Sequence, residues 1–275
     1  AGKWHRQVSF LSADIVDEFN EKGASVIEGD FGENVLVYGI DFKKLPVGTK
    51  LICNDVKFEV TQIGKECHSH CEIYKRVGDC IMPREGIFAK VLEGGMIKVG
   101  DKIKVIYPDK DMPYQAAVIT LSDKGSRGER VDTSGPKASE ILREHGFEII
   151  EEILLPDEMA QIKKELIRLS DSRQVDLIIT TGGTGLSPRD CTPEATLAVA
   201  DRNVPGIAEA IRAGSMTITK RAMLSRGVSV IRKKTLIINL PGSKKAVEEG
   251  LSFIIDQLPH GLDTLRGNTQ DCGRN

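Results

Sequence analysis

Three stretches in the C-terminal half of the chain are almost continuously apolar and end abruptly in glycine, serine or aspartate. They are QAAVITLSD at 115–123, VDLIITTGG at 175–183 and LIINLPGS at 236–243. An alternating apolar and polar pattern indicates a strand with one solvent-exposed face, whereas an unbroken apolar run indicates a strand that is buried on both faces. These stretches therefore predict a parallel sheet with helices packed on both sides.

Apolar residues with a helical period lie between and after these strands. Three stripes run through Ala138, Ile141, Leu142 and His145, then Met159, Ile162, Leu166 and Leu169, and finally Val247, Gly250, Leu251, Ile254, Ile255 and Leu258. Residues three and four apart share one face of a helix, so each stripe indicates a helix that packs on the sheet. The alternation of strand and helix predicts a doubly wound, mainly parallel α/β domain at 114–270.

The first 108 residues follow a different period. Val56, Phe58 and Val60 alternate with polar residues, and glycine- and proline-rich turns separate such segments. A period of two indicates strands with one buried face. The pattern predicts a mostly antiparallel β-barrel or sandwich at 1–108, interrupted by one helix at Ala13 to Asn20, with a linker at 108–113.

Composition excludes some classes of protein. The 275 residues carry a net charge of −2 at pH 7, without the basic excess that nucleic-acid binding requires. No apolar run approaches the roughly 20 residues of a membrane-spanning helix. Six cysteines without a secretory leader fit a reducing compartment better than a disulfide framework, so we expect a cytoplasmic protein.

Small and acidic residues follow the predicted parallel strands. Ser122 and Asp123 follow the first, Asp157 the second, the segment TTGGTGLSPRD at 180–190 the third, and Pro241-Gly242-Ser243 the last. In an open parallel sheet, ligands bind beyond the carboxyl ends of the strands. We therefore expect these four segments to meet at one rim and to form a ligand site.

The residue types at this rim suit a phosphate ligand. Glycines 182, 183 and 185 allow the backbone to approach a ligand closely, and Thr192-Pro193 and Ser243 are predicted to begin helices, whose free N–H groups favour anions. A helix end contributes only about 0.3 to 1 kcal/mol per anionic group, so a triphosphate also needs a cation. No phosphate-loop lysine motif is present to supply it.

Carboxylates offer another way to bring in positive charge. Asp157 and Asp190 end neighbouring predicted strands, and Asp123 and Asp132 lie in the first loop. Mg2+ is typically held by one or two carboxylates together with phosphate oxygens and water. Ordinary solvated loop aspartates are the alternative interpretation of each residue taken alone.

Three motifs together are specific. TTGGTGLSPRDCTPEAT is preceded by TLSDKGSRGERVDTSGP and followed by MLSRGVSVIRK and LIINLPGSKKAV. In content and order, residues 115–267 resemble the molybdopterin adenylyltransferases of the MogA/MoaB type. The resemblance implies that the terminal phosphate of molybdopterin attacks the α-phosphate of ATP, which yields adenylylated molybdopterin and pyrophosphate. It also implies a homotrimer formed through this domain.

The resemblance implies roles for particular residues. Asp157 and Asp190 would hold Mg2+ and orient the phosphates. The other implied nucleotide- and molybdopterin-binding residues are Ser122, Asp123, Asp132, Ser134, Gly182, Gly183, Thr184, Gly185, Ser225, Arg226, Pro241, Gly242 and Ser243. Ser225 and Arg226 are expected to reach the pterin or its phosphate, and Cys191 to be a small buried thiol.

The N-terminal half has a cysteine- and histidine-rich segment, GKECHSHCEIYKRVGDC at 64–80. Its spacing does not match the paired ligands of common structural zinc sites, so a single reactive thiol is the favoured interpretation over zinc. Residues 2–107 resemble the MOSC domain, a β-barrel that handles molybdenum cofactor or its sulfur. Cys71 best matches the reactive cysteine of that family, with Cys80 in reserve, and a soft thiolate suits molybdenum or a persulfide.

The sequence thus predicts a fusion of a MOSC domain with a molybdopterin adenylyltransferase domain. The MOSC domain would bind, sulfurate or deliver the cofactor, and other cofactor-assembly proteins or molybdoenzymes are expected partners. One alternative is a carrier that holds molybdopterin without ATP turnover. Another is a CinA-type relative of the same fold, which would lack the full RDCTPEAT segment followed by LPGS.

Overall fold

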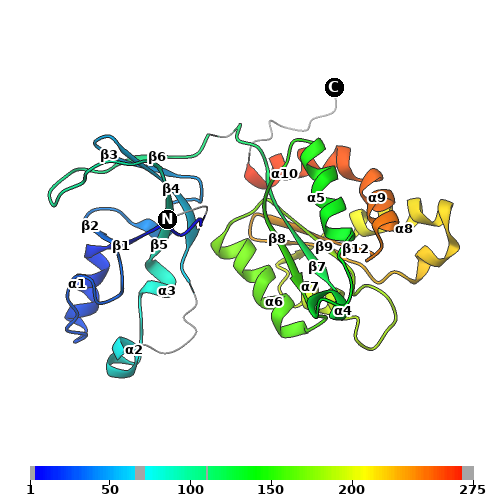
Figure 1. Cartoon of the computed structure of the whole chain (residues 1–275), viewed down its shortest axis with the longest axis horizontal. Coiled ribbons are helices and arrows are strands. Elements are labelled where there is room, and N and C mark those ends of the chain that lie inside the picture. The colour runs from blue at the N-terminus through cyan, green and yellow to red at the C-terminus, as the bar shows by residue number, and fades with distance from the viewer. Residues whose placement is uncertain (1–3, 66–71, 110, 268–275) are drawn as a thin grey trace. The chain divides into compact units, whose positions relative to one another are not determined.

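A computed structural model describes residues 4–65, 72–109 and 111–267. The chain forms two compact units, Ala1–Lys110 and Asp111–Asn275, which are described separately. Figure 1 shows the strands and helices of both. In the described part of the chain, no helix combines the length and the apolar character needed to cross a membrane.

The first unit contains a six-stranded sheet in the order β2-β1-β5-β4-β3-β6. The strands are β1 (Val8–Ser12), β2 (Val35–Val37), β3 (Lys50–Cys53), β4 (Val56–Ile63), β5 (Ile87–Glu93) and β6 (Lys104–Ile106). Only the β1–β2 pair is parallel among the described pairings, so the sheet is mostly antiparallel.

The mostly antiparallel arrangement of the strands was predicted correctly, but the described strands do not close into a barrel. The strands at the two edges, β2 and β6, span three residues each and do not pair with one another in the described structure. Barrel closure requires every strand to find two neighbours. The alternating pattern correctly identified strands with one buried face, but it carried no information about whether the sheet closes.

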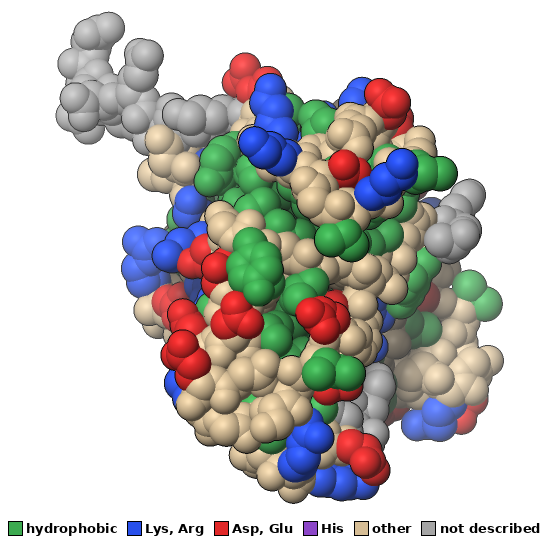
Figure 2. Space-filling view, turned by 90° about the vertical axis from the view of Figure 1, so that its left-hand side faces the viewer, with side chains coloured by type: hydrophobic (Ala, Val, Ile, Leu, Met, Phe, Trp, Pro, Cys, Tyr) green, Lys and Arg blue, Asp and Glu red, His purple; other side chains and the backbone are tan. Residues whose placement is uncertain are grey.

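Helices cover part of this sheet. The predicted helix at Ala13 to Asn20 is confirmed as α1 (Ala13–Glu21). The prediction of one helix missed three short helices among the described residues: η1 (Phe42–Lys44), α2 (Glu72–Val77) and α3 (Met82–Glu85). Neighbouring residues of β1 point to different cores: Phe10 packs with Phe42 and Phe58, and Leu11 packs with residues of α1. Figure 2 shows apolar and acidic side chains interspersed on one face of the molecule.

The second unit contains the predicted sheet. Its strands are β7 (Gln115–Leu121), β8 (Glu148–Leu155), β9 (Leu177–Thr181), β10 (Arg202–Asn203), β11 (Ser229–Arg232) and β12 (Thr235–Leu240), in the order β10-β11-β12-β9-β7-β8. The four strands from β12 to β8 are parallel, and β10, β11 and β12 pair antiparallel. A mainly parallel α/β fold is confirmed.

Helices pack on both faces of this sheet (Figure 1). They are α4 (Asp123–Ser126), α5 (Ser134–Glu144), α6 (Met159–Ile167), α7 (Thr192–Leu197), α8 (Pro205–Ile218), α9 (Lys244–Ser252) and α10 (Leu258–Arg266), with short turns η2 (Arg168–Ser172), η3 (Lys220–Leu224) and η4 (Ile255–Gln257). In β7, Ala116 and Val118 join the core under α5 and α9, whereas Ala117 and Ile119 join the core under α6. Burial on both faces explains the unbroken apolar runs.

Some helix predictions need correction. His145 ends α5 in an exposed position, where its Nδ1 lies 2.8 Å from the Ile141 carbonyl oxygen. Met159 is 41% exposed at the start of α6. The single C-terminal stripe is divided among α9, η4 and α10, and Pro259 lies in the first turn of α10, where it needs no N–H partner. The remaining stripe residues are buried as a group, so the period marked the buried face but not the helix ends.

Candidate active site

The carboxyl ends of β7, β8, β9 and β12 meet at one rim of the second unit, around a pocket of about 530 Å³. Most of the residues predicted for the site line it: Ser122, Asp132, Ser134, Asp157, Gly182, Gly183, Thr184, Gly185, Asp190, Pro241, Gly242 and Ser243. These residues come from four segments that are far apart in the sequence. Asp123, Ser225 and Arg226 do not line the pocket.

The glycine turn after β9 brings two carboxylates to its backbone. A Cβ atom on Gly183 would lie 2.8 Å from Asp157 Oδ1 and 2.2 Å from Thr192 Oγ1, and the φ of +63° at Gly183 also disfavours a side chain. A Cβ on Gly185 would lie 2.8 Å from Asp190 Oδ2. The turn therefore needs glycine because Asp157 and Asp190 occupy the space beside it.

Asp157 carries a carboxylate that the protein only partly satisfies. Its Oδ2 accepts the Asp123 N–H at 3.1 Å, whereas its Oδ1 is buried and has no hydrogen-bond partner in the described structure. Burial, joined by the negative charges of Asp123 and Asp190, raises the pKa of Asp157 above its ordinary value. A cation at Oδ1 would relieve both the missing partner and the charge repulsion.

Asp190 lies at the end of the segment that follows the glycine turn. Its Oδ2 accepts the Ser187 N–H at 3.1 Å, and its own N–H donates to the Ser187 carbonyl at 3.0 Å. The two carboxylates fit Mg2+, which takes few protein oxygens and completes its coordination with phosphate and water. Among the described residues, no group of three or more histidines, cysteines, aspartates or glutamates is arranged to hold a metal ion.

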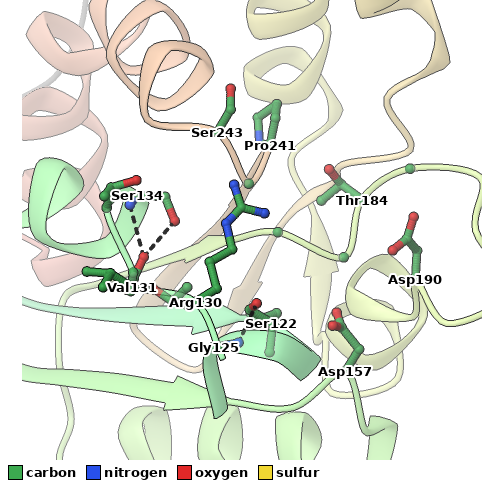
Figure 3. Close-up of a pocket in the computed structure, with 18 residues that line it drawn as sticks. Ser122, Gly125, Arg130, Val131, Ser134, Asp157, Thr184, Asp190, Pro241 and Ser243 are labelled. Atoms are coloured by element: carbon green, nitrogen blue, oxygen red, sulfur yellow. Dashed lines mark hydrogen bonds between the residues drawn. The ribbon is translucent and has the colours of Figure 1, made fainter. Parts of the chain in front are cut away.

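Asp132 holds the loop that leads to Ser134, and Figure 3 shows Ser134 across the pocket from Asp157 and Asp190. Its Oδ2 accepts the Thr120 hydroxyl at 2.6 Å, and its Oδ1 accepts the Ser134 N–H at 2.9 Å and the Ser134 hydroxyl at 3.0 Å. Ser134 Oγ also lies 2.9 Å from Thr181 Oγ1. Asp132 thus connects the loop before α5 to the ends of β7 and β9.

Arg130 is a pocket residue that the sequence analysis missed. It belongs to the loop that Asp132 anchors, and Figure 3 shows its side chain extending across the pocket toward Pro241. Among the described residues that line the pocket, it is the only lysine or arginine. The sequence indicated that a phosphate site would need positive charge. Three basic residues follow the first strand, Lys124, Arg127 and Arg130, and the sequence alone does not show which of them lines the pocket.

Two helices were predicted to begin near the pocket with a capping side chain, and the structure confirms one of these two caps. Ser243 caps α9 as predicted, because its Oγ accepts the Ala246 N–H at 3.2 Å. The predicted cap at Thr192 is wrong: Cys191 is the N-cap of α7, and Thr192 Oγ1 instead donates to the Gly182 carbonyl at 3.0 Å. The hydroxyl is drawn inward because Thr192 is fully buried beneath the glycine turn. Cys191, predicted to be buried, is only partly buried, and this burial raises the pKa of its thiol.

The predicted residues outside the pocket have other partners. Arg189 pairs with Asp123 at 2.9 Å, and its guanidinium holds the pKa of that carboxyl below its ordinary value. Ser225 Oγ accepts the Gly227 N–H at 3.3 Å. Arg226 donates to the backbone of the segment that carries Asp190. Their predicted contacts with substrate remain predictions.

Residues 117–260 match the family model described as a probable molybdopterin binding domain. The chain belongs to this family. Residues 1–104 match the model of the MOSC domain. Cys71, predicted as the reactive thiol of that domain, lies outside the described residues.

The second unit is similar to several named proteins. A molybdopterin adenylyltransferase of Helicobacter pylori strain J99 is 40% identical over 153 residues, which cover 55% of this chain and 87% of the relative. That of Escherichia coli K12 is 44% identical over 142 residues, 50% of this chain and 72% of the relative. The crystal structure of the molybdopterin biosynthesis enzyme MoaB from Thermus thermophilus has 47% identity and a TM-score of 0.54, covering 56% of this chain and 97% of the MoaB chain.

Proposed function

We propose that the second unit transfers AMP from ATP to the terminal phosphate of molybdopterin. The observation that carries this proposal is the pair Asp157 and Asp190 beside the glycine turn, with the buried Asp157 Oδ1 left without a partner in the described structure. A site that only stored a pterin would not need to bury a carboxylate oxygen in this way, whereas a metal-bound triphosphate would satisfy it. Relatives named molybdopterin adenylyltransferase support the choice of substrates.

The reaction requires positioning more than proton transfer. An oxygen of the molybdopterin phosphate forms a bond to the α-phosphorus of ATP, and the bond from that phosphorus to the bridging oxygen of the β-phosphate breaks, so that pyrophosphate leaves with the electron pair. The attacking phosphate is already ionised at neutral pH, so no general base is needed. Alignment of the two phosphates and stabilisation of charge are the contributions left to the protein.

Different pocket residues would hold the metal, contact the phosphates and supply positive charge. Asp157 and Asp190 would hold Mg2+, which when bound neutralises phosphate charge. The backbone at Gly182 to Gly185 approaches the phosphates without side chains in the way, and Arg130 supplies a positive charge from the opposite side of the pocket. Asp132 and Ser134 fix the loop from which Arg130 extends.

Pyrophosphate release from ATP in the presence of purified molybdopterin tests the proposal. We expect wild-type protein and Asp256→Asn to release pyrophosphate at equal rates, since Asp256 is exposed in η4 away from the strand ends. Asp190→Asn is expected to lower the rate by at least about a hundredfold, the scale of lost electrostatic stabilisation at a reacting centre. Equal, measurable rates for all three proteins would show that Asp190 does not take part in AMP transfer. No release by the wild type would favour a molybdopterin carrier without ATP turnover.

For the first unit we propose that it binds, sulfurates or delivers molybdenum cofactor through Cys71. The match of residues 1–104 to the MOSC model supports this role. Cys71→Ser should abolish retention of molybdenum or sulfur and leave AMP transfer intact, and unchanged metal and sulfur content would disprove it. A homotrimer formed by the second unit, a cytoplasmic location, and contacts with other cofactor-assembly proteins or molybdoenzymes belong to the same proposal.

A further inference from the structure

Arg226 holds both ends of the segment that carries Asp190. Its Nε donates to the Gly185 carbonyl at 2.6 Å, and its Nη2 donates to the Asp190 carbonyl at 2.7 Å. Nη1 pairs with Glu194 in the first turn of α7. The backbone N–H of Arg226 also donates to the Thr184 carbonyl at 2.9 Å. One residue between η3 and β11 therefore spans the connection from the glycine turn to α7.

This connection determines where the Asp190 carboxylate lies. Asp190 Oδ2 occupies the space beside Gly185, and the hydrogen bond that it accepts from the Ser187 N–H comes from within the same segment. A local bond fixes the carboxylate relative to the segment but not the segment relative to the pocket. The bonds from Arg226 to the Gly185 and Asp190 carbonyls provide such a constraint, and of the two anchors of the segment they are the one that binds Asp190 itself, whereas Arg189 ties the segment to Asp123.

We propose that Arg226 is a positioning residue that aims the Asp190 carboxylate at the metal-binding end of the pocket. The inference rests on the proposed function for the identity of the metal and substrates. It differs from the role predicted from sequence, in which Arg226 reaches the pterin or its phosphate. All three guanidinium nitrogens are engaged by the protein, and the residue does not line the pocket.

The chemistry of arginine suits this task. A guanidinium presents several N–H donors in one rigid plane and can bind two carbonyls and a carboxylate at once, whereas a lysine ammonium is a flexible point charge. The ion pair between Arg226 and Glu194 contributes little to the stability of this arrangement, because the two side chains are 33% and 48% exposed. The two carbonyl bonds are the part that transmits geometry to Asp190.

Two readouts on Arg226→Gln and Arg226→Lys test the inference. The first is binding of Mn2+, a paramagnetic substitute for Mg2+, measured by spin resonance in the presence of α,β-methylene ATP, which cannot be cleaved at the reacting bond. The second is steady-state pyrophosphate release with varied molybdopterin. Arg232→Gln is the matched control, because Arg232 pairs with Asp171 and the Val199 carbonyl, none of which lines the pocket.

We expect Arg226→Gln to weaken Mn2+ binding about tenfold, the usual scale when a group that orients a metal ligand is lost. The turnover number should fall with it, and the KM for molybdopterin should stay within about twofold. Arg226→Lys should recover only part of the Mn2+ affinity, and Arg232→Gln should not change it. If Arg226→Gln fails to fold, the lysine variant decides by the same two readouts.

Opposite results would overturn the inference. A large rise in the KM for molybdopterin with unchanged Mn2+ affinity would identify Arg226 as a substrate ligand, and no change in either readout would leave it without a positioning role. Failure of the proposed function is distinguishable, because wild-type protein would then release no pyrophosphate while the comparison of Mn2+ affinities could still be made.

Discussion

Asp123 and Asp157 exchange hydrogen bonds: the backbone N–H of each donates to the carboxylate of the other, and both bonds are 3.1 Å long. The pair joins the residues that follow β7 and β8, so the two strand ends are held in register at the rim. The exchange also occupies Asp157 Oδ2 and turns Oδ1 inward, toward the glycine turn. The partly unsatisfied carboxylate is thus a consequence of how the two strands end.

Asp157→Asn should abolish AMP transfer and yet stabilise the protein in the absence of Mg2+. Because the folded pKa of Asp157 is raised, the folded state binds its proton more tightly than the unfolded state, and the free energy of unfolding falls as pH rises from the ordinary aspartate pKa through the folded pKa. Asparagine does not ionise, so the variant avoids this decrease in the free energy of unfolding. We expect an increase of about 1 kcal/mol at neutral pH, or about 2–4 °C in melting temperature, and a smaller gain at pH 3.

Thermal melts from pH 3 to 7, with and without Mg2+ and ATP, check this prediction. Ligand binding to the folded state should stabilise the wild type and not the variant. A variant that melts below the wild type at pH 7 without Mg2+ would mean that Asp157 is already satisfied by the protein.

The glycines of the turn should separate stability from activity. At Gly183 the positive φ and the contact with Thr192 Oγ1 both oppose a side chain, so Gly183→Ala should lower the free energy of unfolding by about 1–3 kcal/mol. At Gly185 the near neighbour of a Cβ is the carboxylate of Asp190. Gly185→Ala should therefore displace that carboxylate, with a small effect on melting temperature and a large loss of pyrophosphate release. Equal effects of the two variants on stability would contradict this assignment.

Arg130→Ala should weaken the binding of ATP without disturbing the fold. Charge-assisted hydrogen bonds to a phosphate contribute about 1.5–3 kcal/mol, so we expect the KM for ATP to rise at least about tenfold. Arg127→Ala is the control, because Arg127 is in the same loop, pairs with Glu129 at 2.7 Å and does not line the pocket. The two KM values, measured side by side, should differ, and a matching rise in both would assign the effect to the general charge of the loop.

Asp132→Ala should act through the loop rather than through direct contact with substrate. It removes the acceptor for Thr120, for Ser134 and, at 3.2 Å, for the Gly135 N–H at the start of α5. Loss of such a cap costs about 0.5–2 kcal/mol, and the KM for ATP should rise as Arg130 loses its anchored loop. Combined with Arg130→Ala, the increase in KM should not be additive. Full additivity would show that Asp132 contacts the substrate independently.

The parallel sheet and its rim could be predicted because burial on both faces forces long apolar runs, and turn residues mark where each run ends. The first loop resisted prediction at the level of single side chains. Arg127 and Arg130 differ by three positions in the same polar segment, and the anchoring of Asp132 to Thr120 places Arg130 at the pocket. Sequence spacing cannot reveal a hydrogen bond between a loop and a strand end.

Two other features depended on tertiary contacts in the same way. Thr192 precedes a proline and matches a helix cap, but burial beneath the glycine turn gives its hydroxyl a different partner. The alternation in the first unit identified one-sided strands, whereas it did not indicate that the edge strands β2 and β6 are short and leave the described sheet open. The spacing of apolar residues in the sequence shows which face of a strand or helix is buried. It does not show which residues far apart in the chain come into contact.

If Asp157 and Asp190 hold Mg2+ as proposed, the small number of protein ligands beside them makes the binding of the cation and of the nucleotide depend on each other. Two like charges repel a free polyphosphate, and two carboxylates alone bind Mg2+ weakly. Each solute therefore creates the other's site, and thermodynamic reciprocity requires that the cation raise nucleotide affinity by the same factor by which the nucleotide raises cation affinity. The concentration of free magnesium would then determine the fraction of protein molecules that have nucleotide bound.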